Sequence, residues 1–403
     1  MQDAVDLAVV GGGAAGLMAA IQAAEALAGA SITVLEAFRE PGRKVLISGG
    51  GRCNVLPLVP APERFVSESP PRLVRRFLDR WTLEEQRAFF EELLGGRLRE
   101  ERETRKLFPP GNRSKDVRDA LLSRAARGGV RVRCGAPVRE LGRLSDGRWS
   151  AGEVNARAVV LATGGLSVLA GGADARGLDW AVALGHTVRA TYAALAPLTA
   201  SGTPHAALAG VSLPARLEAT AGMERAVSSG GFLFTHRGYS GPAALDVSHV
   251  VERSGRQARV TVSFASGMDE ALRAGTGTVA GFLKRLLPDR LAELLLREAG
   301  VEDVPLARLT REARRALVSA LEGWELPADG TEGYRTAEVM GGGIALEEVD
   351  PGSGASRRHR GLFFAGEILD AFGPIGGFNF QWAWASGRSA GVGAARLILE
   401  GGA

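Results

Sequence analysis

The stretch from Val5 to Glu36 constrains the fold of this chain most, because it predicts a strand, a glycine turn, a helix and a second strand in direct succession. Residues 5–10 form a short apolar run, which is typical of a buried parallel strand. Residues 11–16 read GGGAAG, and the alanine-rich segment 14–27 favours a helix. A second β-rich run, 31–35, ends directly before Glu36. This β-α-β unit predicts an α/β fold with a parallel sheet.

The glycines follow the spacing G-x-G-x-x-G, which suits a dinucleotide. Gly11 permits the tight turn, Gly13 lets the backbone approach a pyrophosphate, and Gly16 lets the helix pack on the strand. The free N–H groups at the start of the helix attract the phosphates. Glu36 can accept hydrogen bonds from the ribose hydroxyls, and an acid at this position disfavours the 2′-phosphate of NADP. The motif does not separate NAD from FAD.

Two later strand ends favour FAD. Residues 158–165, AVVLATGG, run from an apolar strand into Thr163 and Gly164. Residues 361–370, GLFFAGEILD, end a short strand at Gly366 and Glu367, where open α/β sheets bind ligands. We interpret that acid as an acceptor for the ribityl chain of a flavin.

Gly376 and Gly377 precede a predicted C-terminal helix over about 379–399. The N-terminus of this helix would stabilise the negative charge that a reduced flavin carries at its N1–C2=O edge. No second G-x-G-x-x-G stands between a strand and a helix. We therefore expect no separate nicotinamide domain, so that NAD(P)H would act as a transient reductant.

A second glycine cluster lies in residues 44–55, KVLISGGGRCNV. We interpret it as the other half of one clamp on the same cofactor, with basic side chains that offset phosphate charge and with Asn54 at the flavin edge. The cofactor contacts that we expect for non-covalent FAD are Gly11, Gly13, Ala14, Ala15, Gly16, Glu36, Ala37, Arg43, Lys44, Ser48, Gly49, Gly50, Gly51, Arg52, Cys53, Asn54, Val138, Ala162, Thr163, Gly164, Gly366, Glu367, Gly376, Gly377, Phe378 and Asn379.

Cys53 and Cys134 are the only cysteines, and they are too far apart in sequence for a zinc motif or a disulfide framework. A redox thiol beside a flavin needs a partner thiol, usually in a C-x-x-C motif, which Cys53 lacks. We therefore expect no metal site, and we interpret Cys53 as a small, partly buried residue next to the cofactor.

The composition is that of a soluble globular protein, with 45% hydrophobic and 23% charged residues. The net charge is +4 and the pI is about 9.4, but the arginines alternate with acids, which is typical of solvated helix faces. No uncharged apolar stretch reaches about 18 residues, and the N-terminus lacks a signal-peptide pattern. We expect a cytoplasmic protein with no membrane partner and, on this charge pattern, no nucleic-acid partner. The oligomeric state stays open.

Seven segments carry a family resemblance: VVGGGAAGLMAA, GRKVLISGGGRCNV, KLFPPGNRSKDVRDALL, VVLATGGLS, LFTHRGYSGPAAL, GLFFAGEILD and GGFNFQWAWASGRSAG. The chain resembles, from start to end, the bacterial FAD-dependent oxidoreductases of the aminoacetone oxidase-like, or BaiN-like, family. The resemblance implies a Rossmann-like FAD-binding domain assembled from both termini, with an inserted mainly-β domain and a small helical subdomain. The boundaries that we expect are 1–190 and 337–403 for the FAD domain, and 191–336 for the insert, β-rich over 191–265 and helical over 266–336.

The chain departs from the family pattern near the expected flavin and substrate. Leu56 and Pro57 stand where relatives have Thr-Asn, and residues 168–177 are also changed. The resemblance therefore implies the cofactor but not a particular substrate.

The run 235–241, THRGYSG, gathers hydrogen-bond donors and an imidazole in a glycine-bearing loop. We predict His236 as an acid/base residue and Tyr239 as its neighbour in the chemistry. A turn-ordering role for the histidine and a packing role for the tyrosine are the alternatives.

The function that we expect is hydride transfer at flavin N5 with a small organic substrate, either amine oxidation or reduction of a conjugated C=C or C=O. Two alternatives stay open. One is a flavin-dependent RNA-modifying enzyme, for which the basic pI leaves room, and the other is a non-enzymatic flavin redox sensor.

Overall fold

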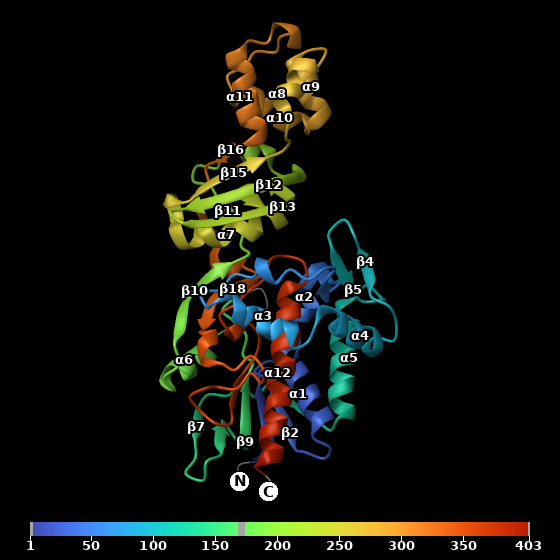
Figure 1. The fold of residues 1–403 in the computed structure, drawn as a ribbon, viewed down its shortest axis with the longest axis vertical. Helices are drawn as coiled ribbons and strands as arrows, with labels where there is room; N and C mark the ends of the chain where they lie inside the picture. The colour runs from blue at the N-terminus through green and yellow to red at the C-terminus, as the bar shows by residue number, and fades with distance from the viewer. Residues whose placement is uncertain (1–2, 168–173, 402–403) are drawn as a thin grey trace. The chain divides into compact units, whose positions relative to one another are not determined.

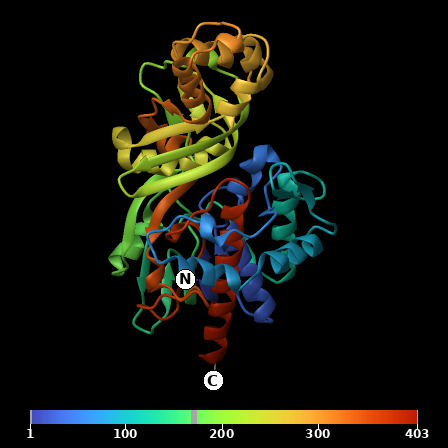
Figure 2. The same cartoon turned by 45° about the horizontal axis from the view of Figure 1, so that its top comes forward.

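The computed structural model describes residues 3–167 and 174–401. The chain forms two compact units, drawn in Figures 1 and 2. Unit 1 comprises residues 1–191 and 339–403, and unit 2 comprises residues 192–338. We propose that these units are the two domains, with boundaries close to those expected from the sequence.

Unit 1 is built on a mixed sheet whose centre is parallel. The strand order is β6-β2-β1-β9-β8-β7, and β19 also pairs with β9. The pairs β1·β2, β1·β9, β2·β6 and β9·β19 are parallel, and β7 and β8 are antiparallel. The expected α/β class is confirmed. The strands are β1 Asp3–Val10, β2 Ile32–Leu35, β6 Arg131–Arg133, β7 Leu141–Arg143, β8 Trp149–Ala151, β9 Val154–Leu161 and β19 Leu362–Phe364.

The helix that follows the first strand packs directly on the last helix of the chain. Helix α1 spans Ala14–Ala26 and α12 spans Phe378–Glu400, and Figure 1 draws them side by side. A Cβ added to Gly391 would lie 2.2 Å from the carbonyl oxygen of Ala19, so only a glycine permits this close approach. A Cβ added to Gly387 would lie 2.5 Å from the carbonyl oxygen of Ala15, so this position also requires glycine. The two ends of the sequence therefore share one core.

Helices and a small sheet complete unit 1. Helices α3 and α4 contact α12, helix α5 contacts α1, and the antiparallel sheet β3-β5-β4 follows the second glycine cluster in the chain. The chain leaves unit 1 through β10 and returns through β18, which pair with each other. These elements are α2 Arg43–Gly51, β3 Leu56–Pro57, η1 Pro62–Arg64, α3 Pro71–Asp79, α4 Leu83–Leu93, β4 Arg99–Glu101, β5 Lys106–Phe108, α5 Ser114–Arg127, α6 Arg176–Ala183, β10 Val188–Ala194, β18 Val339–Ile344, η7 Leu346–Glu348 and η8 Gly366–Ile368.

Unit 2 holds a second seven-stranded sheet, in the order β16-β15-β12-β13-β14-β11-β17, with its own apolar core. Its strands are β11 Leu198–Thr199, β12 Ser212–Ala221, β13 Glu224–Phe234, β14 Gly238–Ser240, β15 Arg259–Ser263, β16 Trp324–Leu326 and β17 Gly330–Thr331. Its helices are η3 Ala206–Leu208, α7 Pro242–Ser254, η4 Gly255–Gln257, α8 Met268–Ala274, α9 Val279–Leu286, α10 Asp289–Glu298, η5 Leu306–Arg308, α11 Arg311–Glu322 and η6 Gly333–Arg335.

The division of unit 2 into a β part and a helical part is less sharp than the sequence suggests. Helix α7 lies inside the segment expected to be β-rich, and it begins at a proline and buries Ala243 and Val247, four residues apart, in the core of the unit. Conversely, β16 and β17 come from the segment expected to be helical, and they extend the sheet by pairing with β15 and β11. Long-range pairing decides these elements.

Candidate flavin site

The carboxyl ends of four parallel strands bring many of the predicted cofactor residues to one edge of the sheet of unit 1. β1 ends before Gly11, β2 before Glu36, β9 before Ala162 and β19 before Ala365 and Gly366. A Cβ on Gly11 would lie 2.3 Å from the carbonyl oxygen of Ala162, and a Cβ on Gly366 would lie 2.7 Å from the Cβ of Ala15. This edge is where open α/β sheets bind ligands.

The three glycines of the G-x-G-x-x-G motif have different surroundings. Gly11 has a φ of +108°, and a Cβ on Gly16 would lie 1.9 Å from the carbonyl oxygen of Gly11. Around Gly13, in contrast, no described atom lies within 4 Å of an added Cβ. Gly13 is the N-cap of α1 and forms no side-chain capping bond, so the first N–H groups of the helix are available to an anion.

Glu36 is buried at the end of β2, where it binds the glycine turn. Its Oε2 accepts a hydrogen bond from the N–H of Gly12 at 2.7 Å, and its Oε1 accepts one from the N–H of Phe38 at 2.9 Å. A carboxylate oxygen has two lone pairs, so each of these atoms can accept a further bond from a ribose hydroxyl. The residue therefore fits the predicted ribose contact and also stabilises the turn itself.

The second glycine cluster ends a helix and turns the chain. α2 is regular over its first five residues, but Ser48 has an extended ψ of 149° and the three glycines that follow have φ between +56° and +82°. Gly50 and Gly51 have no described atom within 4 Å of an added Cβ. The cluster therefore makes a left-handed backbone segment that leaves space beside it, as a cofactor contact requires.

Cys53 and Asn54 follow the glycine turn, and both have buried side-chain atoms. Cys53 has a φ of +63° and no exposed surface, and burial raises the pKa of its thiol to about 12. The thiol therefore stays protonated and unreactive, which favours a packing role. The buried Oδ1 of Asn54 finds no hydrogen-bond partner within the described part of the chain. A bound group with a donor would satisfy it.

The predicted basic residues divide between the site and its surroundings. The Nζ of Lys44 lies 2.5 Å from Oε2 of Glu367 and 2.6 Å from the hydroxyl of Ser167, so it joins α2 to the ends of two strands. Arg52 instead forms an ion pair with Glu101 at 2.9 Å. The guanidinium of Arg43 lies 4.2 Å above the ring of Phe38.

The start of α12 lies against the segment in which this chain departs from the family pattern. Gly377, the N-cap, has a φ of +93°, and a Cβ there would lie 2.4 Å from the carbonyl carbon of Leu56. The Leu56–Pro57 departure is therefore in contact with the predicted flavin edge of the site. The side-chain amide of Asn379 donates to the carbonyl of Gly373 and accepts from its N–H, both at 2.8 Å.

Other residues of α12 support the site, although they were not predicted from the sequence. The indole of Trp382 donates to the carbonyl of Gly366 at 3.1 Å, and the hydroxyl of Ser386 accepts from the N–H of Gly366 at 2.9 Å. The indole of Trp384 donates to the carbonyl of Val55 at 3.0 Å. The sequence QWAWAS, residues 381–386, could have indicated these contacts, because a buried tryptophan needs a hydrogen-bond partner for its N–H group.

Asp370 is a second supporting residue that was not predicted. Its buried Oδ2 accepts hydrogen bonds from the N–H and hydroxyl of Ser69, both at 3.0 Å, and from Ser67 and the N–H of Glu68. Burial raises the pKa of this carboxyl. The cluster fixes the segment before α3 to the loop that carries Glu367.

The remaining predicted contacts have less support from local geometry. Ala14, Ala15, Ala37, Thr163 and Phe378 adjoin the residues above in sequence. Val138 follows a turn in which the N–H of Ala136 donates to the carbonyl of Glu36, so this position reaches the same edge. The changed residues 168–173 lie outside the described residues.

Both predicted catalytic residues belong to unit 2. His236 is exposed in the turn between β13 and β14. Tyr239 is fully buried in the core of the unit, where its hydroxyl lies 2.7 Å from Nδ1 of His205. This burial favours the packing role for Tyr239, while the acid/base role of His236 stays a prediction.

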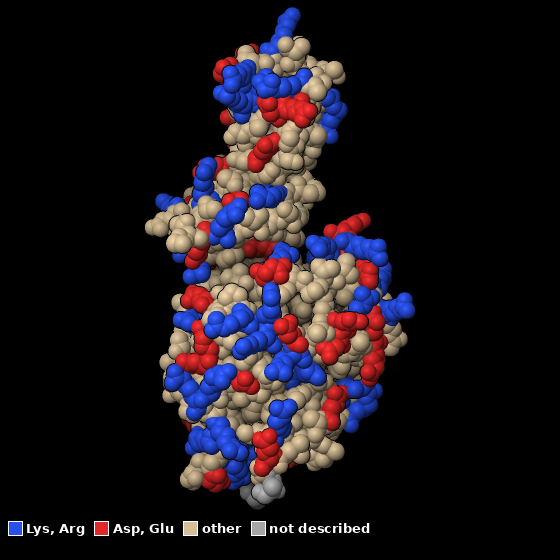
Figure 3. Space-filling model, viewed as in Figure 1, with Lys and Arg blue, Asp and Glu red and all other residues tan. Residues whose placement is uncertain are grey.

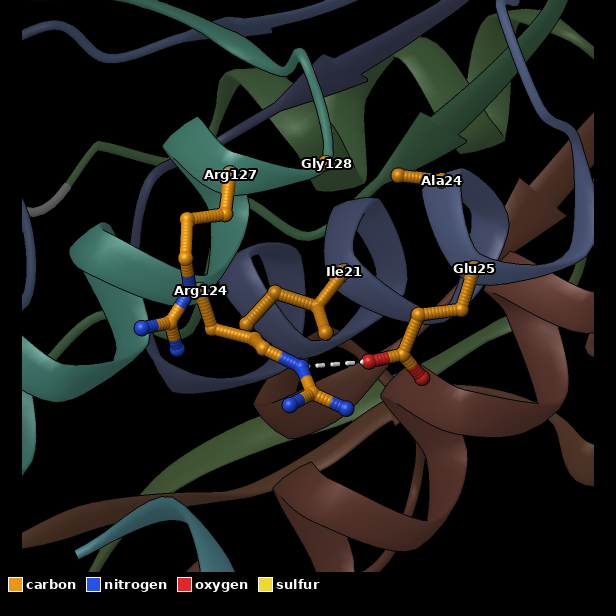
Figure 4. Close-up of a pocket in the computed structure, with 6 residues that line it drawn as sticks. All are labelled: Ile21, Ala24, Glu25, Arg124, Arg127 and Gly128. Atoms are coloured by element: carbon orange, nitrogen blue, oxygen red, sulfur yellow. Dashed lines mark hydrogen bonds and ion pairs between the residues drawn. The ribbon is translucent and has the colours of Figure 1, made fainter.

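The crevice in Figure 4 is separate from the cofactor edge. It lies between α1 and α5 and is lined by Ile21, Ala24, Glu25, Arg124, Arg127 and Gly128. The guanidinium of Arg124 and the carboxylate of Glu25 form an ion pair at 2.7 Å within it. Ala24 is ten residues along α1 from Ala14, or about 15 Å at the rise of a helix.

Among the described residues, no group of three or more His, Cys, Asp or Glu side chains could hold a metal ion. No helix in the described part of the chain is long and apolar enough to cross a membrane.

The residues at this edge fit FAD on three observations. Gly13, Gly50, Gly51 and Gly164 have open space where a side chain would stand. The N-terminus of α1 is uncapped by a side chain, and the buried Oδ1 of Asn54 has no partner among the described residues.

Comparison with known proteins assigns the family. Residues 5–393 match the model of the HI0933-like protein Rossmann domain. The chain is 32% identical to the ribosomal RNA dihydrouridine synthase of Haemophilus influenzae over 94% of its own length and 95% of that protein. It is 33% identical to the ribosomal RNA dihydrouridine synthase of Escherichia coli, covering 94% of this chain and 96% of that protein. It is also 30% identical to the 3-dehydro-bile acid delta(4,6)-reductase of Clostridium scindens, with coverage of 96% and 98%.

Solved structures support the fold. An E. coli quinol fumarate reductase subunit superposes with a TM-score of 0.53 at 18% identity, covering 100% of this chain and 72% of that one. A 3-ketosteroid dehydrogenase from Rhodococcus jostii gives 0.52 at 17% identity, with coverage of 98% and 97%. The family resemblance seen in the sequence is thus confirmed, and the chain belongs to the HI0933-like family of FAD-dependent oxidoreductases.

Proposed function

We propose that this enzyme reduces a carbon–carbon double bond conjugated to a carbonyl, and that its substrate is a uridine in ribosomal RNA. The observation that carries the proposal is the match, over nearly the whole chain, to two ribosomal RNA dihydrouridine synthases. Of the two reactions expected from the sequence, amine oxidation and reduction of a conjugated double bond, we retain the reduction. The absence of a nucleic-acid partner, expected from the alternating charges, is not proposed further.

The reaction adds two electrons and two protons to the C5=C6 bond of uracil. The carbonyl at C4 makes C6 the carbon that accepts a hydride, and a proton completes C5. The chemistry that reduced FAD would supply, when held at the glycine edge, is hydride donation. We propose NAD(P)H as the transient reductant, because the chain has no second G-x-G-x-x-G unit.

The chain contributes binding, orientation and a proton. The glycine turn and α1 would hold the pyrophosphate, Glu36 would orient the ribose, and Lys44 and Glu367 would line the ribityl chain. The dipole of α12 stabilises negative charge at the site. We propose an acid/base role for His236 of unit 2, since it is an exposed imidazole in a glycine-bearing turn.

A second candidate substrate is a ketosteroid with a conjugated diene. It is favoured by the 30% identity to the bile acid delta(4,6)-reductase over nearly the full length. The chemistry at the flavin is the same, so the two candidates differ only in what binds beside it.

The test is reduction by the FAD-loaded protein under anaerobic conditions with NADH or NADPH. Two substrates are offered in parallel: unmodified ribosomal RNA transcribed in vitro, and a 3-keto-4,6-diene steroid. Dihydrouridine in digested RNA is measured by nucleoside mass spectrometry, and steroid reduction by the loss of diene absorbance. The Glu36→Ala variant, depleted of FAD, is the control for flavin dependence.

We expect dihydrouridine at one or a few positions of the RNA and no turnover of the steroid. Reduction of the steroid alone would replace the proposed substrate with the second candidate. A protein that neither binds FAD nor reduces either substrate would contradict the assignment of the site.

A further inference from the structure

The arginines of α3 differ from Arg87 and Arg124, on two other helices of unit 1, in lacking ionic partners. Arg87, on α4, pairs with Glu91 and Glu100, and Arg124, on α5, pairs with Glu25 and Glu92. In α3, Arg72, Arg75, Arg76 and the adjoining Arg80 are all exposed. Within the described residues, none of these four forms an ion pair with an acid.

The sequence of α3 places these arginines on one side of the helix. Leu73, Val74, Phe77 and Leu78 are buried, and the ring of Phe77 lies 5.1 Å from that of Trp382 on α12. The arginines occupy the opposite positions, at spacings of three and four residues. They are therefore held on a helix whose apolar side is fixed to the core.

Two more arginines extend this surface. The guanidinium of Arg388, on α12, donates to the carbonyl of Arg80 at 3.0 Å. Arg357 lies 3.6 Å from Asp350, and a Cβ on Gly352 would lie 3.4 Å from both the guanidinium of Arg80 and the carboxylate of Asp350. We name the six residues Arg72, Arg75, Arg76, Arg80, Arg357 and Arg388 the arginine face. Figure 3 shows basic side chains gathered over α3 and α12 on the side that it presents.

Few acids offset the charge of this surface. Asp350 lies 3.6 Å from Arg357, and Glu85 is bound to the Thr82 cap of α4. Asp79 is exposed at the end of α3. Within α3 itself three arginines stand against one acid, Asp79, so the exposed side of this helix keeps a positive excess.

The arginine face is joined to the flavin site by a short segment of chain. Ser69, two residues before α3, is bonded to Asp370 in the loop that follows Glu367. The ring of Phe65 lies 6.0 Å from that of Phe378, the first residue of α12. α3 itself has nine residues, or about 13 Å at the rise of a helix.

We propose that the arginine face binds the phosphate backbone of the RNA whose uridine is reduced at the flavin site. This inference rests on the proposed function for the identity of its ligand. Four of its six guanidinium groups, on α3 and at Arg80, are exposed and have no acid partner among the described residues, which suits phosphate oxygens. An arginine with an acid partner, such as Arg357, would have to give that partner up. Contacts of this kind position RNA without reading its sequence.

The experiment measures binding of a fluorescently labelled, uridine-rich 20-nucleotide RNA by anisotropy over a range of salt concentrations. The test variant combines Arg72→Gln, Arg75→Gln and Arg76→Gln. Arg80 and Arg388 are left unchanged, because the side chain of Arg388 is hydrogen-bonded to the backbone of Arg80. The matched control combines Arg97→Gln, Arg127→Gln and Arg131→Gln, three exposed arginines of unit 1 that also lack a described ion-pair partner. Bound FAD and the melting temperature are recorded for each protein.

We expect the test variant to lose at least about tenfold in affinity near 0.1 M salt. Its plot of log K against log salt should be shallower by about 2, because each single-strand phosphate contact contributes roughly 0.7 to the slope. The control should change affinity by less than about twofold, and the triple Arg→Lys variant should restore the slope. All variants should keep their FAD.

Wild-type affinity in the test variant, or an equal loss in the control, would overturn the inference. The result is separable from the proposed function. If the arginine dependence holds but no dihydrouridine forms, the RNA surface stands and the reaction is wrong. If dihydrouridine forms at the same rate in the test variant, the reaction stands and the surface is wrong.

Discussion

The two glycine clusters of unit 1 use the same residue for different physical reasons. In the first, Gly11 and Gly16 are required by packing, since added side chains would meet backbone atoms at 2.3 and 1.9 Å. In the second, Gly50 and Gly51 meet nothing, and their positive φ is what excludes other residues. Each cluster also leaves open space, beside Gly13 in the first case.

This difference separates fold from ligand binding at the level of single residues. Substitution of a packed glycine should damage the protein, whereas substitution of an open glycine should damage the cofactor contact. A glycine with positive φ and open space should do both, by a smaller amount. The predictions for Gly16 and Gly50 test this ordering, and those for Glu36 and Cys53 test two other residues of the same site.

The largest effect is expected for Gly16→Ala. The methyl group would overlap the carbonyl oxygen of Gly11, so α1 would have to move away from β1, at a cost of about 3 kcal/mol or more in the free energy of unfolding. Gly13→Ala should change that free energy by less than about 1 kcal/mol, because its φ of −79° suits alanine, but it should weaken FAD binding. Urea unfolding and FAD titration measure the two quantities. A Gly16→Ala protein as stable as wild type would refute the packing argument.

Glu36→Ala is expected to affect both quantities. It leaves the N–H groups of Gly12 and Phe38 without their acceptors, which costs about 1–3 kcal/mol of stability. It also removes the ribose contact, and we expect FAD to bind about tenfold more weakly, equivalent to about 1.4 kcal/mol.

Glu36→Gln keeps one carbonyl acceptor and is the matched control. We expect it to lose less stability than the alanine variant while still binding FAD more weakly than wild type. Unchanged FAD affinity in both variants would show that the ribose is bound elsewhere.

Gly50→Ala isolates the second cluster. A left-handed alanine costs about 1–2 kcal/mol. Gly29, in the turn after α1, is the matched control. Its φ is +79°, against +66° for Gly50, and its surroundings are equally open. The Gly29→Ala variant should therefore lose the same amount of stability. Only the Gly50 variant should lose FAD affinity. Equal FAD affinity in the two variants would mean that the space beside Gly50 is solvent.

The smallest effect is expected at Cys53. With a thiol pKa of about 12, raised by burial, almost none of this residue is thiolate at pH 8. A disulfide reagent should therefore titrate one thiol, the exposed Cys134, in the native protein and two in urea. In the Cys134→Ser variant the native count should fall to zero. A fast second thiol would reopen the redox interpretation.

The sequence predicted the parts of the site that depend on local structure. The β-α-β unit, the role of Gly16 and the acid at the end of β2 follow from contacts within 36 residues, whereas the packing of Gly11 depends on Ala162 of a distant strand. The FAD-type strand ends at Ala162 and Gly366 were also visible, because strand, glycine and acid follow directly in the chain. The regular part of α2, before its glycines, was not expected.

Contacts between distant segments could not be predicted from one sequence. The Lys44–Glu367 ion pair joins residues 323 positions apart, and the tryptophans of α12 reach back to Val55. Tyr239 looked available in a glycine-bearing loop, but the sheet and helices of unit 2 bury it. The charge pattern suggested solvated helix faces, and only the fold shows which arginines have acid partners.

The sequence by itself therefore determined the fold class, the family and the type of cofactor, since these follow from short-range patterns of glycine, apolar runs and acids. Only the tertiary structure decided which glycines are packed and which are open, which carboxylates hold backbone amides, and where unpaired arginines gather. The physical reason is that burial, ion pairing and open space depend on which segments meet, and those segments are separated by tens to hundreds of residues along the chain.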